Sequence, residues 1–245
     1  MQHSHSLFIS DLHLCESRPH INRLFFDFLT QTAIHADGLY ILGDLFEYWL
    51  GDDTLNQPLN QQVASALHQL ADTGVNIYFM HGNRDFLIAQ DFATASGAQL
   101  IADPSLIDLY GTPTLLMHGD TLCTDDVKYL AFREQVRHPA WQSQFLAQSL
   151  ATRTALARQV REQSESAKQE KSSDIMDVNN AAVTTTLQQH GYPRLIHGHT
   201  HRSTVHTHTI DNHLCQRWVL PDWYEQGGYL RCDADGCVFS ILTTS

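Results

Sequence analysis

Five short polar blocks in this sequence combine side chains that bind divalent metal ions. They are Asp11-Leu12-His13, Gly43-Asp44, Gly82-Asn83-Arg84-Asp85, His118-Gly119-Asp120 and Gly198-His199-Thr200-His201. In an extended segment residues two apart face the same side, so Asp11 and His13 can bind one ion. The pair His199 and His201 has the same spacing. Aspartate, asparagine and histidine without cysteine form an oxygen and nitrogen donor set, which suits manganese, iron or zinc. One such block alone would be weak evidence, but five in series predict a metal centre.

Each block follows a short apolar run of the kind that forms a buried strand. The runs cover residues 7–9, 39–42, 77–80, 115–117 and 195–196. Helical patterns separate some of them, for instance over 21–33 and 62–72. Strands that alternate with helices predict a layered α/β fold. Because ligands in such folds gather beyond the carboxyl ends of the strands, the elements should bring the five blocks to one edge.

Between the fourth and fifth blocks the pattern changes. Residues 126–189 carry no strand signal, and their apolar residues recur at helical spacing, which predicts a helical insertion over the strand ends. We therefore divide the chain into a core of residues 1–124 and 194–245 and a helical lid of residues 125–193. After the fifth block, segments 204–210, 216–220, 229–232 and 238–242 alternate and predict antiparallel strands, with Asp235-Gly236 as a turn.

The insertion is basic in an otherwise acidic chain. Residues 128–171 hold eight basic and four acidic residues, a net charge of +4, which leaves −16 on the remainder out of the total of −12. A basic lid with aromatic residues suits an anionic headgroup, acyl chains and an anionic membrane surface. The alternative is that the apolar stripe packs on itself and the cations form a solvated face.

The bulk composition narrows the class of protein. The 245 residues are 42% hydrophobic and fit one domain or a core with one insertion. A net charge of −12 argues against a general nucleic-acid binder. No signal peptide and no apolar run long enough to span a membrane is recognisable, so we expect a cytoplasmic protein. The five cysteines are scattered without a CxxC pair, which favours reduced thiols.

The five blocks resemble those of the calcineurin-like metallophosphoesterases, and the resemblance covers nearly the whole chain. It implies a layered metallophosphoesterase sandwich with mixed sheets flanked by helices. It also implies two ligand sets that share Asp44: one of Asp11, His13, Asp44 and His201, and one of Asp44, Asn83, His118 and His199. A shared carboxylate can hold two cations about 3.5–4 Å apart, and a water between them has its pKa lowered to about 7. The cations also neutralise charge that builds on phosphoryl oxygens.

One position narrows the choice of leaving group. Many members of this superfamily have histidine after the asparagine, where it can protonate an alkoxide. Here the residue is Arg84, which stays charged and is a poor proton donor. An alkoxide, with a conjugate-acid pKa of about 16, needs that proton, whereas a phosphate, with a pKa of about 6, does not. Arg84 therefore favours cleavage of a pyrophosphate linkage.

Longer strings around the blocks are similar to those of the UDP-2,3-diacylglucosamine hydrolases of bacterial lipid A synthesis. They include Asp44-Leu45-Phe46-Glu47-Tyr48-Trp49, Met80-His81-Gly82-Asn83-Arg84-Asp85-Phe86 and Ile175-Met176-Asp177-Val178-Asn179. The resemblance implies attack of water on the uridine-side phosphorus, two Mn²⁺ ions per chain (Fe or Zn being the alternatives), and peripheral binding to the cytoplasmic face of the inner membrane. It implies catalytic roles for Asn83 and Arg84. The implied substrate contacts are Asn83, Arg84, Asp126, Ser164, Lys171 and His199, with Lys168 where the family has asparagine.

Other interpretations remain open from the sequence. The chain could be a metallophosphoesterase for another nucleotide pyrophosphate or phosphodiester, or a scaffold without activity, although a scaffold would be expected to lose ligands. His81 and His197 are expected to support ligands or pack rather than to bind metal. Asp85 and Asp120 could orient loops and ligands or could simply cap turns.

Overall fold

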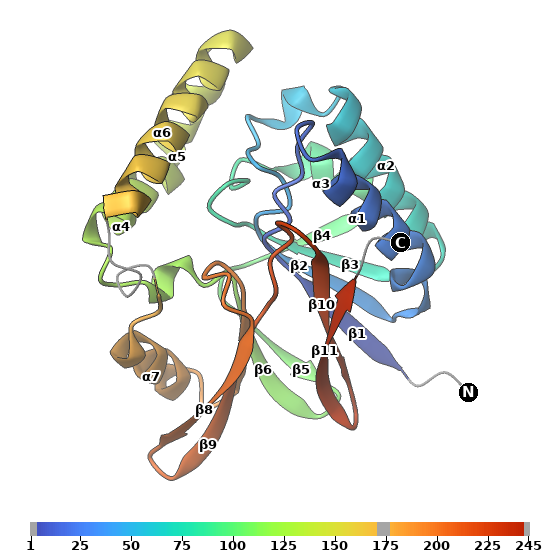
Figure 1. The fold of residues 1–245 in the computed structure, drawn as a ribbon, viewed down its shortest axis with the longest axis vertical. Coiled ribbons are helices and arrows are strands. Elements are labelled where there is room, and N and C mark those ends of the chain that lie inside the picture. Colours follow the sequence, from blue (N-terminus) through green and yellow to red (C-terminus); the bar gives the residue numbers. More distant parts are fainter. Residues whose placement is uncertain (1–3, 171–176, 243–245) are drawn as a thin grey trace.

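The computed structural model describes residues 4–170 and 177–242, with side chains as far as residue 162 in the first range. Two β-sheets form its centre, with helices on their outer faces (Figure 1). The elements in chain order are β1 (His5–Ile9), α1 (Pro19–Gln31), β2 (Gly38–Leu42), α2 (Pro58–Asp72), β3 (Asn76–Met80), α3 (Gln90–Ser96), β4 (Ala98–Ile101), β5 (Ser105–Leu109), β6 (Thr112–Met117), α4 (Val127–Arg137), α5 (Pro139–Leu146), α6 (Leu150–Glu170), α7 (Asn180–Gln189), β7 (Arg194–His197), β8 (Thr204–Ile210), β9 (His213–Val219), β10 (Gly227–Asp233) and β11 (Gly236–Leu242). The expected layered α/β class and the five expected strands before the polar blocks are confirmed.

The first sheet has the order β11-β10-β1-β2-β3-β4. Its strands β1 to β4 are parallel, and β10 joins β1 antiparallel. Successive side chains alternate between faces, so Leu7 and Ile41 point to α1, α2 and α3, where they meet Phe25, Leu67 and Phe92 in one buried core. Proline at the start of α1 and of α2 suits the first turn of a helix, where its missing N–H costs nothing.

The second sheet has the order β5-β6-β7-β9-β8, with β6 and β7 parallel. A second core fills the space between the sheets, where Phe8, Leu42 and Met80 of the first sheet meet Leu116 and Ile196 of the second. Because β1, β2, β3, β6 and β7 all end at the same edge of this sandwich, the five polar blocks are brought together there.

Helix α7 belongs to the sandwich. Val183 and Leu187, one turn apart, are buried against Leu115, Leu195 and Cys215 on the outer face of the second sheet. This helix lies within residues 125–193, the segment that we expect as the helical insertion, and it packs on the second sheet. The reason is that one face of a sheet has to be covered, and α7 carries the apolar pair that covers it.

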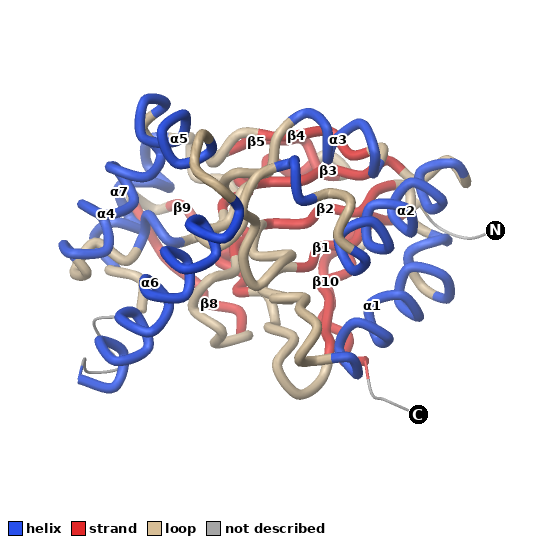
Figure 2. The backbone as a smooth tube through the Cα atoms, turned by 90° about the horizontal axis from the view of Figure 1, so that it is seen from above, coloured by secondary structure: helices blue, strands red, loops and turns tan. Residues whose placement is uncertain are grey.

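Helices α4, α5 and α6 form the part of the insertion that stands beside the strand ends (Figures 1 and 2). We call these three helices the lid. Phe145 of α5 is buried in the core under α1 to α3, and Trp141 packs against it. Arg153 of α6 is also buried, and it donates to both carboxylate oxygens of Asp53 and to the carbonyl of Leu50. No helix within residues 4–170 and 177–242 is long and apolar enough to cross a membrane.

Three local features differ from the expectations. Strands β4 and β5 were not predicted, because each is short and partly exposed. The hairpin between β10 and β11 turns at Ala234-Asp235, one residue earlier than expected, since Asp233 pairs with Gly236. The expectation of five reduced cysteines is wrong for Cys232 and Cys237, which the antiparallel register of β10 and β11 places opposite each other and which form a disulfide.

Candidate metal centre

Two groups of acidic and histidine side chains converge beyond the strand ends. Asp11, His13 and His201 form one group, and Asp11, Asp44 and His118 form the other, with the candidate ligand atoms of each within 4.8 Å of one another. His201 Nε2 lies 3.3 Å from Asp11 Oδ1, and His118 Nε2 lies 3.8 Å from Asp44 Oδ1. Asp11, His13, Asp44 and His118 are buried, whereas the His201 side chain is 23% exposed, so the cluster opens to water on the side of His201.

Asn83 brings the last predicted ligand, His199, into the same cluster. Asn83 Oδ1 lies 3.0 Å from His118 Nε2 and 3.0 Å from His199 Nδ1. The backbone N–H of His199 also donates to Asp11 Oδ2 at 2.8 Å. The structure therefore brings all seven predicted ligands together, although they come from five separate strand ends.

The backbone at this cluster is unusual. Asp11, His13, Asp44, His199 and His201 all have positive φ values, between 51° and 68°. Residues with a Cβ adopt this left-handed region at a cost, and such residues concentrate at functional sites. The sharp turn at each strand end is what points two side chains of an Asp-x-His or His-x-His pair into one space.

Two glycines permit the close approach of the loops. A Cβ on Gly82 would lie 2.1 Å from Asp44 Oδ1, and a Cβ on Gly198 would lie 2.3 Å from Asp11 Oδ2. No side chain fits at either position. The glycines in the polar blocks are therefore required for the carboxylates to occupy the cluster.

Hydrogen bonds from outside the cluster orient two of the histidines. His118 Nδ1 lies 2.9 Å from the carbonyl of Leu42 and donates to it, and Nε2, on the other side of the ring, faces Asn83. His201 Nδ1 lies 3.3 Å from Asp222 Oδ2, on the far side of the ring from Asp11. A ligating histidine that gives its other N–H to a carbonyl or carboxylate has its tautomer and ring direction fixed.

The charges of the cluster stabilise one another. Burial would raise the pKa of Asp11, but the hydrogen bond and charge of His201 outweigh it and hold that pKa well below its ordinary value. Burial would lower the pKa of His201, but Asp11 and Asp222 raise it to about 10. Burial raises the pKa of Asp44 to about 7, against the opposing charge of His118. The cluster is thus strongly polar and closely coupled.

The donor set fits divalent metal ions. Both ring nitrogens of His13 are buried and have no hydrogen-bond partner within the described part of the chain. Buried polar atoms without a partner are costly, so such atoms at the centre of a converging cluster indicate a ligand. Carboxylate oxygen, amide oxygen and imidazole nitrogen are donors that Mn, Fe and Zn accept.

Asp85 and Asp120 hold the surroundings of the cluster in place. The Asp85 carboxylate is buried and accepts the backbone N–H groups of Gly82 at 2.9 Å and Leu45 at 2.8 Å, so it ties two ligand loops together. Asp120 accepts hydrogen bonds from Tyr129 and, at 2.7 Å, from Arg133 Nε, both on α4. Of the two readings that the sequence left open, the contacts favour loop orientation over turn capping.

His81 and His197 support neighbouring segments. His81 Nε2 bonds the carbonyl of Ile88 at 2.7 Å. His197 is completely buried, with Nδ1 2.8 Å from the carbonyl of Gly198 and Nε2 3.0 Å from Arg217 Nη1. His81 thus uses one ring nitrogen for its backbone contact, and His197 uses both ring nitrogens.

The residues that we predicted to contact the substrate lie in several different parts of the structure. Arg84 lies at the cluster, where its backbone N–H donates to Asp44 Oδ1 at 2.8 Å. Asp126 caps α4 through the backbone N–H of Tyr129. Ser164 and Lys168 belong to the last turns of α6, beyond the described side chains, and Lys171 lies outside the described residues.

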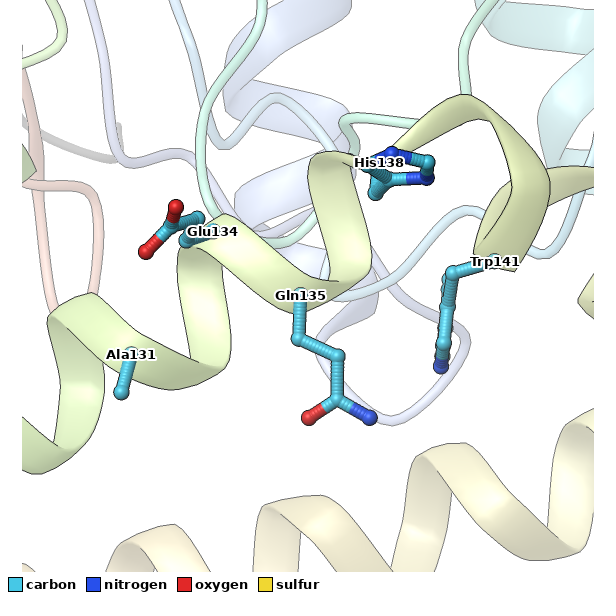
Figure 3. Close-up of a pocket in the computed structure, with 5 residues that line it drawn as sticks. All are labelled: Ala131, Glu134, Gln135, His138 and Trp141. Atoms are coloured by element: carbon cyan, nitrogen blue, oxygen red, sulfur yellow. The ribbon is translucent and has the colours of Figure 1, made fainter.

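Two hollows lie along the lid. The larger, about 400 Å³, is lined by Ala131, Glu134, Gln135, His138 and Trp141 of α4 and α5, and the side chains of Gln135 and Trp141 point into it (Figure 3). The smaller is lined by residues of α4 together with Phe86 and Asn83. Of the two, only the smaller hollow has a residue of the metal cluster, Asn83, in its lining.

Three residues at the site were missed by the sequence analysis. Asp222 contacts His201, Arg18 donates to the carbonyls of Leu12 and His13, and Glu47 contacts the guanidinium of Arg84. Each lies outside the five polar blocks. No spacing signal marks them, because their role depends on partners elsewhere in the chain.

Comparison with known proteins identifies the family of this chain. The calcineurin-like phosphoesterase family model matches residues 5–203. A UDP-2,3-diacylglucosamine hydrolase of Aromatoleum aromaticum is 54% identical over 94% of both chains. A protein of the same name from Xanthomonas axonopodis pv. citri is 52% identical over 97% of this chain and 98% of its own. The chain therefore belongs to the calcineurin-like phosphoesterases and, within them, to the family of UDP-2,3-diacylglucosamine hydrolases.

Proposed function

We propose that this protein hydrolyses the pyrophosphate bond of UDP-2,3-diacylglucosamine in lipid A biosynthesis. Water attacks the uridine-side phosphorus, and the products are UMP and 2,3-diacylglucosamine 1-phosphate. Relatives that bear the name of this activity match nearly the whole chain at 52–54% identity. A metallophosphoesterase for another nucleotide pyrophosphate or phosphodiester is the alternative that an experiment has to exclude.

The observation that carries the proposal is the place of Arg84. Its backbone is bonded to Asp44 in the cluster, and its guanidinium is the cationic group on that loop. Arginine holds its proton, so it serves a leaving group that needs charge stabilisation and no protonation. A sugar 1-phosphate is such a leaving group, because a phosphate has a pKa of about 6. We assign to Arg84 and Asn83 the binding of the reacting phosphate.

The seven ligand candidates divide into two sets in this proposal. Asp11, His13, Asp44 and His201 bind one ion, and Asp44, Asn83, His118 and His199 bind the other. The ions, which we propose to be Mn²⁺, supply Lewis-acid chemistry and lower the pKa of a water to about 7. The protein's own contribution is to hold the ligands: Asp85 joins two of the loops, and Leu42 and Asp222 fix two histidine rings.

The lid supplies substrate selection in this proposal. Asp126, Ser164, Lys168, Lys171 and His199 contact the substrate, and the basic charge of residues 128–171 faces an anionic lipid. The same charge favours peripheral binding to the anionic cytoplasmic face of the inner membrane. We keep residues 125–193 as the insertion that carries this role and residues 1–124 and 194–245 as the catalytic core.

Product identification tests the function. The purified protein is loaded with Mn²⁺ and incubated with UDP-2,3-diacylglucosamine, and the products are analysed by mass spectrometry. UMP and diacylglucosamine 1-phosphate are expected. Parallel reactions contain a chelator, or Fe²⁺ or Zn²⁺ in place of Mn²⁺, to test the metal. An enzyme that cleaves a generic aryl phosphodiester and leaves the lipid nucleotide intact would contradict the substrate and support the alternative.

A further inference from the structure

One buried carboxylate, that of Glu47, lies among three arginines. Glu47 Oε1 is 3.2 Å from Arg161 Nη1 and 3.7 Å from Arg84 Nη1, and its Oε2 is 3.6 Å from Arg18 Nη2. The three cations come from different parts of the molecule: the loop after β3, the loop before α1, and the lid helix α6. The Glu47 side chain is 9% exposed, so water screens these contacts only partly.

The backbone around Glu47 is fixed to both metal-site loops. Its N–H donates to the carbonyl of Leu14 at 3.1 Å, just after the Asp-x-His block. Two residues later, the N–H of Trp49 donates to the carbonyl of Arg84 at 3.0 Å. The backbone of Glu47 is therefore held in place by a neighbouring loop. The same segment also bonds to the backbone of Arg84, whose guanidinium the Glu47 carboxylate contacts.

We propose that Glu47 is a positioning residue that holds the guanidinium of Arg84 for the reacting phosphate and links it to the lid through Arg161. This inference rests on the proposed function, since it assigns a part of the same reaction. Arg84 and Arg161 share one oxygen of Glu47, so the position of α6 and the direction of Arg84 depend on the same atom.

The charge balance of the cluster supports this role. Three guanidinium groups around one carboxylate leave an excess of two positive charges beside the metal centre. That excess attracts a pyrophosphate, which is anionic. Without Glu47 the cluster would attract anions more strongly, but Arg84 would lose the group that fixes its direction.

The variant Glu47→Gln separates these two effects. We expect kcat to fall about 10- to 100-fold, because a misplaced group near the reacting centre has that cost. We expect inorganic phosphate to bind the metal-loaded variant several-fold more tightly, because one negative charge beside the site is gone. Phosphate binding is measured by isothermal titration calorimetry. Glu47→Asp keeps the charge and should recover most of kcat.

The link to the lid is tested by a double-mutant cycle. If Glu47 joins Arg84 to Arg161, the effects of Glu47→Gln and Arg161→Gln on kcat should be less than additive. Glu162→Gln, which removes an exposed carboxylate from the neighbouring position of α6, is the matched control and should leave kcat unchanged. Additive effects would overturn the link between lid and Arg84.

Two other outcomes would overturn the positioning role. One is an unchanged kcat in Glu47→Gln. The other is a joint fall of kcat, phosphate affinity and melting temperature without recovery in Glu47→Asp, which would show a structural role only. A wild-type protein that fails to cleave UDP-diacylglucosamine would overturn the proposed function instead, because phosphate binding and aryl phosphodiester turnover still report on Glu47.

Discussion

The backbone N–H of Arg84 donates a hydrogen bond to Oδ1 of Asp44, with 2.8 Å between the two atoms. Asp44 is the carboxylate that we assign to both metal ions, and Arg84 is the residue that we assign to the phosphate. The contact sets the start of the Arg84 side chain relative to the metal centre. Metal binding and phosphate binding are therefore expected to depend on one rigid loop-to-loop contact.

Asp44→Ala should lower the bound metal and abolish turnover while the fold remains. The reason is that Asp44 lies in the group with Asp11 and His118 and, in our assignment, takes part in both ligand sets. Metal content is measured by plasma mass spectrometry and folding by circular dichroism. Asp235→Ala, in the exposed turn before β11, is the control and should change neither. Two ions still bound with near-normal activity would refute the assignment.

The site of attack can be read from an isotope label. If water strikes the uridine-side phosphorus, hydrolysis in ¹⁸O-labelled water should place the label in UMP. The sugar 1-phosphate should stay unlabelled, because it keeps the oxygen that bridged the two phosphorus atoms. Mass spectrometry of both products gives the answer. Label in the sugar 1-phosphate would mean that the substrate lies in the site in the opposite direction.

Lys171→Ala should impair the lipid substrate selectively. A charge-assisted contact contributes roughly 1.5–3 kcal/mol. At about 1.4 kcal/mol for each factor of ten, its loss lowers kcat/KM about 10- to 100-fold. Remote binding energy can also orient the reacting centre, so kcat should fall together with a rise in KM. Metal content and slow cleavage of an aryl phosphodiester should hardly change.

Arg84→Ala is the comparison for that experiment, because Arg84 lies at the metal cluster and should matter for both substrates. Equal losses on both substrates in Lys171→Ala would place Lys171 in the common machinery or reveal a folding defect. Either result would remove the lid as the element that selects the lipid.

Arg153→Met should loosen the lid. Arg153 is buried and donates to Asp53 and to the Leu50 carbonyl, so its loss detaches α6 from the loop after β2. We expect faster amide hydrogen exchange in α5 and α6 and a fall in lipid-nucleotide hydrolysis. Melting temperature should fall only slightly, because the Asp53 side chain is 60% exposed and can be solvated when it loses its partner.

The matched control is Arg158→Met, which removes an exposed cation from the same helix. It should leave exchange in α5 and α6 unchanged. If exchange rises equally in both variants, the pair with Asp53 does not anchor the lid.

The sequence by itself determined the strand ends and the polar blocks that follow them. Strands β1, β2, β3, β6 and β7 are short apolar runs followed by polar blocks, and both signals are local. Parallel strands end at one edge of a sheet, which is a general property of the fold, so the meeting of the seven candidate ligands could be predicted without coordinates. The helical character of residues 127–170 was equally local, since it rests on spacing along one segment.

Only the tertiary structure decided which other residues complete the site. Asp222 reaches His201 and Arg161 reaches Glu47 across loops and a lid, and no pattern near Asp222 or Glu47 in the sequence announces these contacts. The strength of each of these contacts depends on a short distance between the two charged groups and on burial that removes water. The same holds for α7, whose apolar pair would suit a lid as well as a sheet. The spacing of residues along a segment determines on which face of a strand or helix a side chain lies. Which residue that side chain contacts is determined by how the layers pack.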